Sequence, residues 1–142
     1  MTRKLETYRT LVLLTFAVDA FMQYLYFSGA TLSNELVRVG EWNGYGAVIG
    51  FSGASMLYYA WMFLHFSGLG CMFFYWSIGK WLFLAGVVLG IPGAALSGLV
   101  VLTPLEMTLS NLSYMFSVFA LGMAFFSPPV LARFRSTARA DA

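Results

Sequence analysis

Long apolar segments alternate with short polar ones along the whole chain. Each apolar segment is about as long as an α-helix that crosses the hydrocarbon core of a bilayer. The four apolar segments cover residues 10–27, 45–66, 81–102 and 108–127. Polar residues gather instead at the N-terminus, in residues 28–43, around Lys80 and in the C-terminal tail. The pattern predicts an all-α membrane protein with four transmembrane helices in a single domain.

Small residues recur every four positions in the second and third apolar segments. Such a spacing aligns small side chains in one row along a helix, where a second helix can approach closely. The alternative is a lipid-facing helix on which the small residues have no role in packing. Pro92 lies inside the third segment and is expected to bend it. The predicted helix-packing residues are Gly46, Gly50, Ala54, Gly86, Gly90, Ala94 and Gly98.

Composition and charge favour an integral membrane location. The chain is 60% hydrophobic and only 10% charged, whereas a soluble domain carries about 25% charged residues. Little length remains for a soluble catalytic domain, so we expect no enzyme activity. Basic residues prefer the cytoplasmic side of a membrane, and the two termini and residue 80 hold all of them except Arg38. We therefore expect both termini in the cytoplasm, with the helices in a bacterial inner membrane.

The two halves of the chain resemble each other weakly. Residues 9–13 match residues 80–84 at an offset of 71, and Glu35 matches Glu106 at the same offset. Residues 66–68 match residues 126–128 after a shorter intervening connection. Each half then reads as a basic residue, an apolar segment, a connection with a glutamate and a second apolar segment. The match predicts two parallel two-helix repeats, although general hydrophobicity accounts for part of it.

Four short stretches also resemble a known group of proteins. They are residues 66–73, 80–84, 103–106 and 124–134, which read FSGLGCMF, KWLFL, TPLE and AFFSPPVLARF. These stretches are similar to a group of small four-span bacterial inner-membrane proteins that carry a tandem two-helix repeat. The resemblance touches about half of the chain and implies the same four-span architecture. It implies no particular activity, because none is established for the group.

Asp19 is the main candidate for chemistry. A carboxylate halfway along an apolar segment costs about 2.5 kcal/mol or more on insertion, and it also argues against a cleaved signal peptide. One interpretation is a proton or ion relay, and the other is a protonated, hydrogen-bonded side chain that fixes helix packing. Ser110, Tyr114 and Ser117 share a face of the fourth segment and are possible partners. The residues predicted to form one polar face on the first segment are Thr15, Asp19, Gln23 and Tyr26.

The other polar residues suggest little chemistry. His65 ends the second segment, at a depth different from that expected for Asp19, so the pattern predicts no Ser-His-Asp arrangement. With one His and one Cys in the chain, we expect neither a metal site nor bis-histidine haem ligation, and no cofactor. Glu106 is expected to be solvated near a helix N-terminus. Anionic lipid is the expected partner of the basic C-terminal tail, and nucleic acid is not expected.

These observations favour a structural or accessory subunit of a membrane assembly that works through helix packing. Its expected partners are the lipid bilayer and either copies of itself or other membrane subunits. The alternative function is a small proton- or ion-coupled transporter or channel that uses Asp19.

Overall fold

A computed structural model describes residues 2–28, 49, 51–97 and 104–140. The described residues form five helices and contain no strand. The helices are α1 (Thr2–Ser28), α3 (Phe51–Phe73), α4 (Ser77–Ser97), α5 (Pro104–Phe126) and α6 (Pro128–Ala140).

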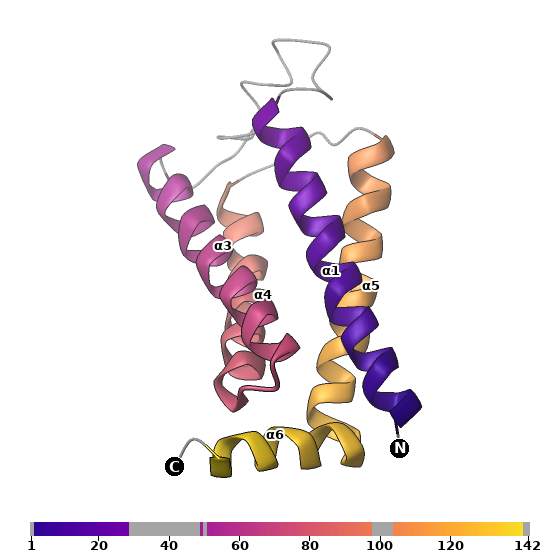
Figure 1. Ribbon diagram of the computed structural model, residues 1–142. Coiled ribbons are helices and arrows are strands. Elements are labelled where there is room, and N and C mark those ends of the chain that lie inside the picture. Colours follow the sequence, from indigo (N-terminus) through magenta and orange to yellow (C-terminus); the bar gives the residue numbers. More distant parts are fainter. Residues whose placement is uncertain (1, 29–48, 50, 98–103, 141–142) are drawn as a thin grey trace.

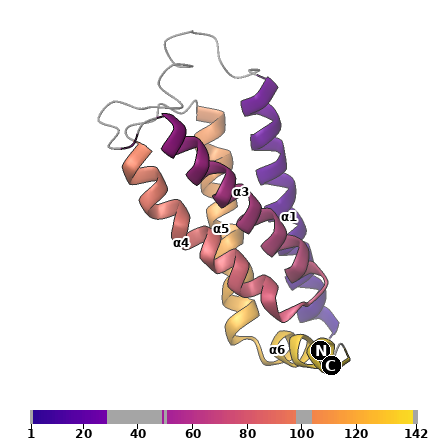
Figure 2. The same ribbon diagram turned by 90° about the vertical axis from the view of Figure 1, so that its left-hand side faces the viewer.

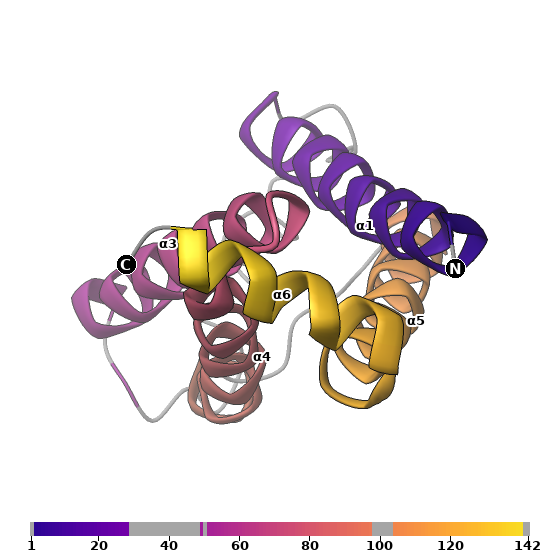
Figure 3. The ribbon, with the colours of Figure 1, turned by 60° about the horizontal axis from the view of Figure 1, so that its bottom comes forward.

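Four helices run lengthwise and the last lies across one end. Helix α3 packs mainly on α4, and α1 packs mainly on α5. Helix α6 runs nearly at right angles to them, beneath the N-terminal end of α1 and the turn between α3 and α4 (Figures 1 and 3). A view along another side shows the lengthwise helices stacked above it (Figure 2). The start of α1 therefore lies at the end of the molecule that carries α6.

Glycines set the close approach of α3 to α4. A Cβ added at Gly68 of α3 would stand 2.5 Å from the backbone nitrogen of Phe83 in α4. A Cβ added at Gly79 of α4 would stand 2.6 Å from the Cβ of Cys71 in α3. Real Cβ atoms essentially never come so close, so the two backbones can touch only where these side chains are missing.

An aromatic core joins α6 to the lengthwise helices. The Tyr8 ring lies 5.4 Å from the ring of Tyr75 and 6.1 Å from that of Phe134, measured between centroids. The Tyr8 hydroxyl donates to the backbone oxygen of Met72, and the Tyr75 hydroxyl donates to that of Leu5, both at 3.3 Å. Each phenol thus ties α1 to the end of α3. Phe134 brings the apolar side of the amphipathic α6 into the same core, where it is 1% exposed.

The two tyrosines of this core are held in their neutral form. Burial raises the pKa of the Tyr8 phenol above its usual range, and the neighbouring Tyr75 raises it further. Burial also raises the pKa of Tyr75, against the lowering effect of Arg9 and Arg133. Tyr75 occupies the turn between α3 and α4 with a φ of 60°. This left-handed conformation is uncommon for a residue with a Cβ, and the buried ring contacts hold it in place.

The prediction of four transmembrane helices in two parallel repeats, with a polytopic four-helix bundle, is wrong. Within the described residues, α5 is the helix long and apolar enough to cross a membrane, and residues 77–92 form a shorter apolar helix. Polar residues explain the difference. Helix α1 begins in a charged segment and carries Asp19 and Gln23, while α3 contains His65 among several serines, glycines and tyrosines. These polar residues interrupt the apolar run of each helix, and neither helix meets the combination of length and apolar character that α5 meets.

Several predicted boundaries also move. The second segment is predicted to end at residue 66, but α3 continues to Phe73, so that only the turn 74–76 separates it from α4. The expected connection at residues 103–107 is mostly helical, because α5 begins at Pro104, a residue suited to a first helical position. The basic C-terminal tail forms a further helix, α6, after Ser127.

The predicted packing residues fall into two groups. Gly86 and Gly90 of α4 both face α3. A Cβ added at Gly86 would lie 3.2 Å from the backbone nitrogen of His65, and one at Gly90 would lie 3.4 Å from the indole nitrogen of Trp61. Ala54 of α3 is buried. Gly46, Gly50 and Gly98, together with the side chain of Ala94, lie outside the described residues, as do Glu35 and Arg38.

Candidate functional site

A buried ionisable pair joins α1 to α3. The Nε2 atom of His65 lies 2.6 Å from the Oδ2 atom of Asp19, and both side chains are about 5% exposed. The expectation that these two residues lie at different depths is wrong. Because α3 extends seven residues past the predicted end at residue 66, His65 lies inside the helix rather than at its end.

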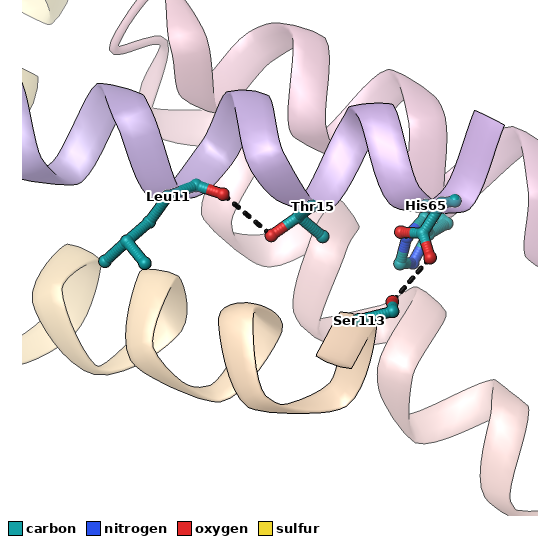
Figure 4. Close-up of polar contacts among 5 residues, drawn as sticks. Leu11, Thr15, His65 and Ser113 are labelled. Atoms are coloured by element: carbon teal, nitrogen blue, oxygen red, sulfur yellow. Dashed lines mark hydrogen bonds and ion pairs between the residues drawn. The ribbon is translucent and has the colours of Figure 1, made fainter. Parts of the chain in front are cut away.

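Ser113 of α5 completes the cluster from the other side. Its hydroxyl donates to the second carboxylate oxygen of Asp19, Oδ1, at 2.5 Å, and Ser113 is itself 9% exposed. Figure 4 shows the Ser113 hydroxyl directed at the carboxylate of Asp19, with the ring of His65 on the far side of that carboxylate. Asp19 therefore connects α1, α3 and α5 through both of its oxygens. We call Asp19, His65 and Ser113 the polar cluster.

The order of the three groups decides what chemistry the polar cluster can support. In a serine hydrolase the histidine lies between the serine and the aspartate, so that it can take the hydroxyl proton. Here the aspartate lies in the middle and Ser113 donates to it directly. The serine thus donates to a carboxylate and not to the imidazole that activates the nucleophile of a serine hydrolase.

Aromatic rings enclose the imidazole of His65. Trp61 stacks on it at 4.9 Å between ring centroids, Phe83 of α4 lies at 4.8 Å and Phe66 meets it edge-on at 5.6 Å. Gly86 leaves space for the backbone of α4 to approach at the same level. The remaining ring nitrogen, Nδ1, is buried and has no hydrogen-bond partner in the described part of the chain. Such a nitrogen is costly to bury without a hydrogen-bond partner.

The other residues predicted on the polar face of α1 have separate partners. Thr15 is fully buried and donates to the backbone oxygen of Leu11 at 2.9 Å, within its own helix (Figure 4). Gln23 accepts a hydrogen bond from the Tyr58 hydroxyl of α3, one helical turn beyond Asp19. The side chain of Tyr26 lies outside the described residues. The structure thus ties Asp19 and Gln23 to α3, and keeps Thr15 within α1.

Sequence reasoning missed both partners of Asp19. Of the three candidates on α5, Ser117 is buried, whereas Tyr114 is 61% exposed and Ser110 is partly exposed. One sequence feature could have identified Ser113, namely the row of small residues that α5 buries against its neighbours. That row consists of Ser113, Ser117, Ala120 and Ala124.

Glu106 also departs from its expected place. It lies in the first turn of α5, where a carboxylate is favoured by the helix dipole. It is 7% exposed, so the expectation of a solvated side chain is wrong.

Comparison of the chain with protein-family models, with curated proteins and with solved structures gave no match. The resemblance described above therefore stays an expectation. Within the described residues there is also no group of three or more His, Cys, Asp and Glu side chains placed to hold a metal ion.

Proposed function

We propose that the protein is a small integral membrane protein that acts as a structural or accessory subunit of a membrane assembly, without catalytic activity. The carrying observation is the large number of bulky apolar side chains that the described helices leave exposed. Examples are Phe63 and Ile91, each 69% exposed, and Val118, 66% exposed. The polar cluster, in contrast, is buried between the helices. Extensive exposed apolar surface is typical of a surface that a membrane or a partner protein covers.

Helix α5 is the membrane-crossing element of this proposal. It is long and apolar enough to cross a bilayer. Its exposed side includes Val118 and Phe119, while the row Ser113, Ser117, Ala120 and Ala124 is buried. Polar contacts between helices are worth about 0.6–2 kcal/mol each in lipid. The polar cluster therefore supports packing of α1 and α3 against α5, and leaves the apolar exterior for lipid and for partner subunits, including copies of the same chain.

Membrane fractionation and native-state sizing test this function together. We expect the chain to remain in the membrane pellet after alkaline carbonate washing and to enter solution only with detergent. In a mild detergent it is expected to purify as an assembly larger than one chain. Release by carbonate alone would contradict the integral location. A strictly single-chain particle, seen by native mass spectrometry under conditions that preserve a known control complex, would contradict the subunit function.

A second candidate function is proton-coupled transport, and the polar cluster favours it. An ionisable pair inside a membrane protein is a default candidate for a proton relay. The 2.6 Å separation between the Nε2 atom of His65 and the Oδ2 atom of Asp19 is short enough for the two side chains to pass a proton between them.

Substitutions at Asp19 separate the two functions. Asp19→Asn keeps the size and hydrogen bonding of the side chain but cannot titrate, whereas Asp19→Glu keeps the titration. If Asp19 couples a proton, Asp19→Asn is expected to assemble normally and lose pH-dependent flux in proteoliposomes, and Asp19→Glu to retain part of it. Native-like, pH-dependent flux in Asp19→Asn would rule out the relay. If the native chain, Asp19→Asn and Asp19→Glu all assemble normally and none shows flux, the result would favour the subunit function over transport.

A further inference from the structure

One end of the molecule collects the basic side chains. The N-terminal turns of α1, the first turn of α4 and the whole of α6 meet there (Figures 1 and 3). Among the described residues, Glu6 is the acidic residue at this end, since Asp19 lies in the polar cluster and Glu106 begins α5 at the opposite end. The described basic side chains of this end are Arg3, Lys4, Arg9, Lys80, Arg133 and Arg135.

Two of these cations are engaged with aromatic rings. The Arg9 guanidinium lies 5.2 Å from the Phe73 ring centroid, and the Lys80 ammonium lies 5.1 Å from that of Phe125. Lys80 also lies 5.6 Å from the ring of Phe134 in α6. Arg9 therefore helps to hold α1 against the end of α3, and Lys80 helps to hold α4 against α5 and α6.

Arg3 and Lys4 have a different setting. They line a groove of about 740 Å³ between the first turns of α1 and the start of α6. In the described part of the chain neither forms an ion pair with a carboxylate. Thr7 lies on the same side of the groove, where its hydroxyl donates to the backbone oxygen of Arg3 at 2.8 Å. The opposite side is formed by Pro128, Pro129 and Ala132.

The chemistry of the two sides identifies the ligand class. Two neighbouring cations suit a phosphate group, but the two prolines supply no backbone N–H donors to it. They offer an apolar wall instead, so the groove suits a phosphate that is joined to an apolar body. The face of α1 that carries Arg3 continues into exposed apolar side chains. Leu14 and Phe21, 41% and 46% exposed, lie at whole turns of the helix from Arg3.

We infer that this groove binds the phosphate headgroup of an anionic phospholipid, with the acyl chains lying along the apolar face of α1. The inference rests on the proposed membrane location. It places the anionic lipid at Arg3 and Lys4, against the start of α6, and not on the C-terminal basic residues. Helix α6 then serves as one wall of a lipid site as well as a surface helix.

Lipid retention by the purified full-length chain tests the site. The chain in non-ionic detergent is mixed with phosphatidylglycerol or phosphatidylcholine, and bound lipid is measured by native mass spectrometry. We expect phosphatidylglycerol to be preferred. Each basic residue near a lipid surface is worth about 1 kcal/mol, so the double variant Arg3→Gln/Lys4→Gln is expected to weaken phosphatidylglycerol binding about tenfold or more.

Two further variants separate a site from diffuse charge. Arg133→Gln/Arg135→Gln removes the same charge from the same end but does not touch the groove, and is expected to change binding by less than about twofold. Ala132→Leu fills the groove without changing charge and is expected to weaken binding. Equal losses in the two double variants, or no effect of Ala132→Leu, would overturn the inference.

The source of the phosphate is tested with inorganic phosphate, matched to chloride in ionic strength. We expect it to displace little phosphatidylglycerol, and efficient displacement would overturn the assignment to a lipid. Failure of the membrane location is distinguishable, because it would appear as release of the native chain by carbonate washing. Failure of this inference would leave the chain in the membrane without lipid preference.

Discussion

At the scale of single residues, the positions that matter most are those where two backbones touch. The four-residue ladders singled out Gly86 and Gly90, but the closest approaches are at Gly68 and Gly79, which no ladder includes. At Gly90 an added Cβ would meet the Trp61 side chain at ordinary contact distance. Spacing identifies a row of small residues. It does not reveal where along that row the partner's backbone comes closest, because this depends on the crossing point of two helices.

Gly68 and Gly70 provide a matched test of this packing. They lie two positions apart on α3, and an added Cβ at Gly70 would have nothing within 4 Å. Gly68→Ala is expected to lower the free energy of unfolding by about 1–3 kcal/mol, because its methyl group would overlap the backbone of Phe83. Gly70→Ala is expected to be neutral or stabilising by up to about 1 kcal/mol from helix propensity. Thermal unfolding in detergent measures both, and equal midpoints would contradict the packing argument.

The polar cluster shows a second limit at this scale. That Asp19 needs a polar partner followed from its position in an apolar segment. That position did not identify the residue that Asp19 contacts. The predicted second helix ends at residue 66, seven residues before the end of α3, so the prediction puts His65 at a helix end. On α5, Ser113 is buried rather than Ser110 because of how the helix is rotated about its axis. The sequence does not determine this rotation, because apolar residues lie on nearly every side of α5.

At the scale of elements, apolar runs located helices better than they located helix ends. Residues 10–27 lie within α1, and residues 108–126 lie within α5. The helix ends depend instead on single residues, which a count of apolar positions does not take into account. Pro104 starts α5, Ser127 separates α5 from α6, and buried Tyr75 sits in the turn that ends α3. The basic tail was read by charge alone, which hid the apolar side of α6 that carries Val130 and Phe134.

The number of membrane crossings could not be derived from apolar length. Helices α1 and α3 contain the groups that make the polar cluster, and those groups lower the apolar character by which a crossing helix is recognised. A long helix with a polar interior face and an apolar exterior face has an intermediate average hydropathy. Only α5 combines sufficient length with sufficient apolar character in the described residues.

At the scale of the whole molecule, the two ends of α5 differ in charge. Its first residues lie far from α6, and its last residues adjoin the end that carries Arg3, Lys4 and the basic residues of α6 (Figure 1). Basic residues are retained on the cytoplasmic side of a membrane. If α5 crosses the membrane as proposed, the end with α6 is expected to face the cytoplasm and the start of α5 the opposite side.

Cysteine labelling tests this orientation in intact cells. In a Cys71→Ser background, single cysteines are placed at Leu105, 50% exposed in the first turn of α5, and at Ser136, exposed on α6. A membrane-impermeant maleimide is expected to label Leu105→Cys in spheroplasts, and Ser136→Cys only after the cells are broken. The reason is that α5, at 23 residues and 1.5 Å of rise per residue, is long enough to place its two ends on opposite sides of the hydrocarbon core. The reverse pattern would show that the basic end faces outward. Equal labelling of both cysteines in spheroplasts would show that α5 does not separate the two ends, and would remove its role as the crossing helix.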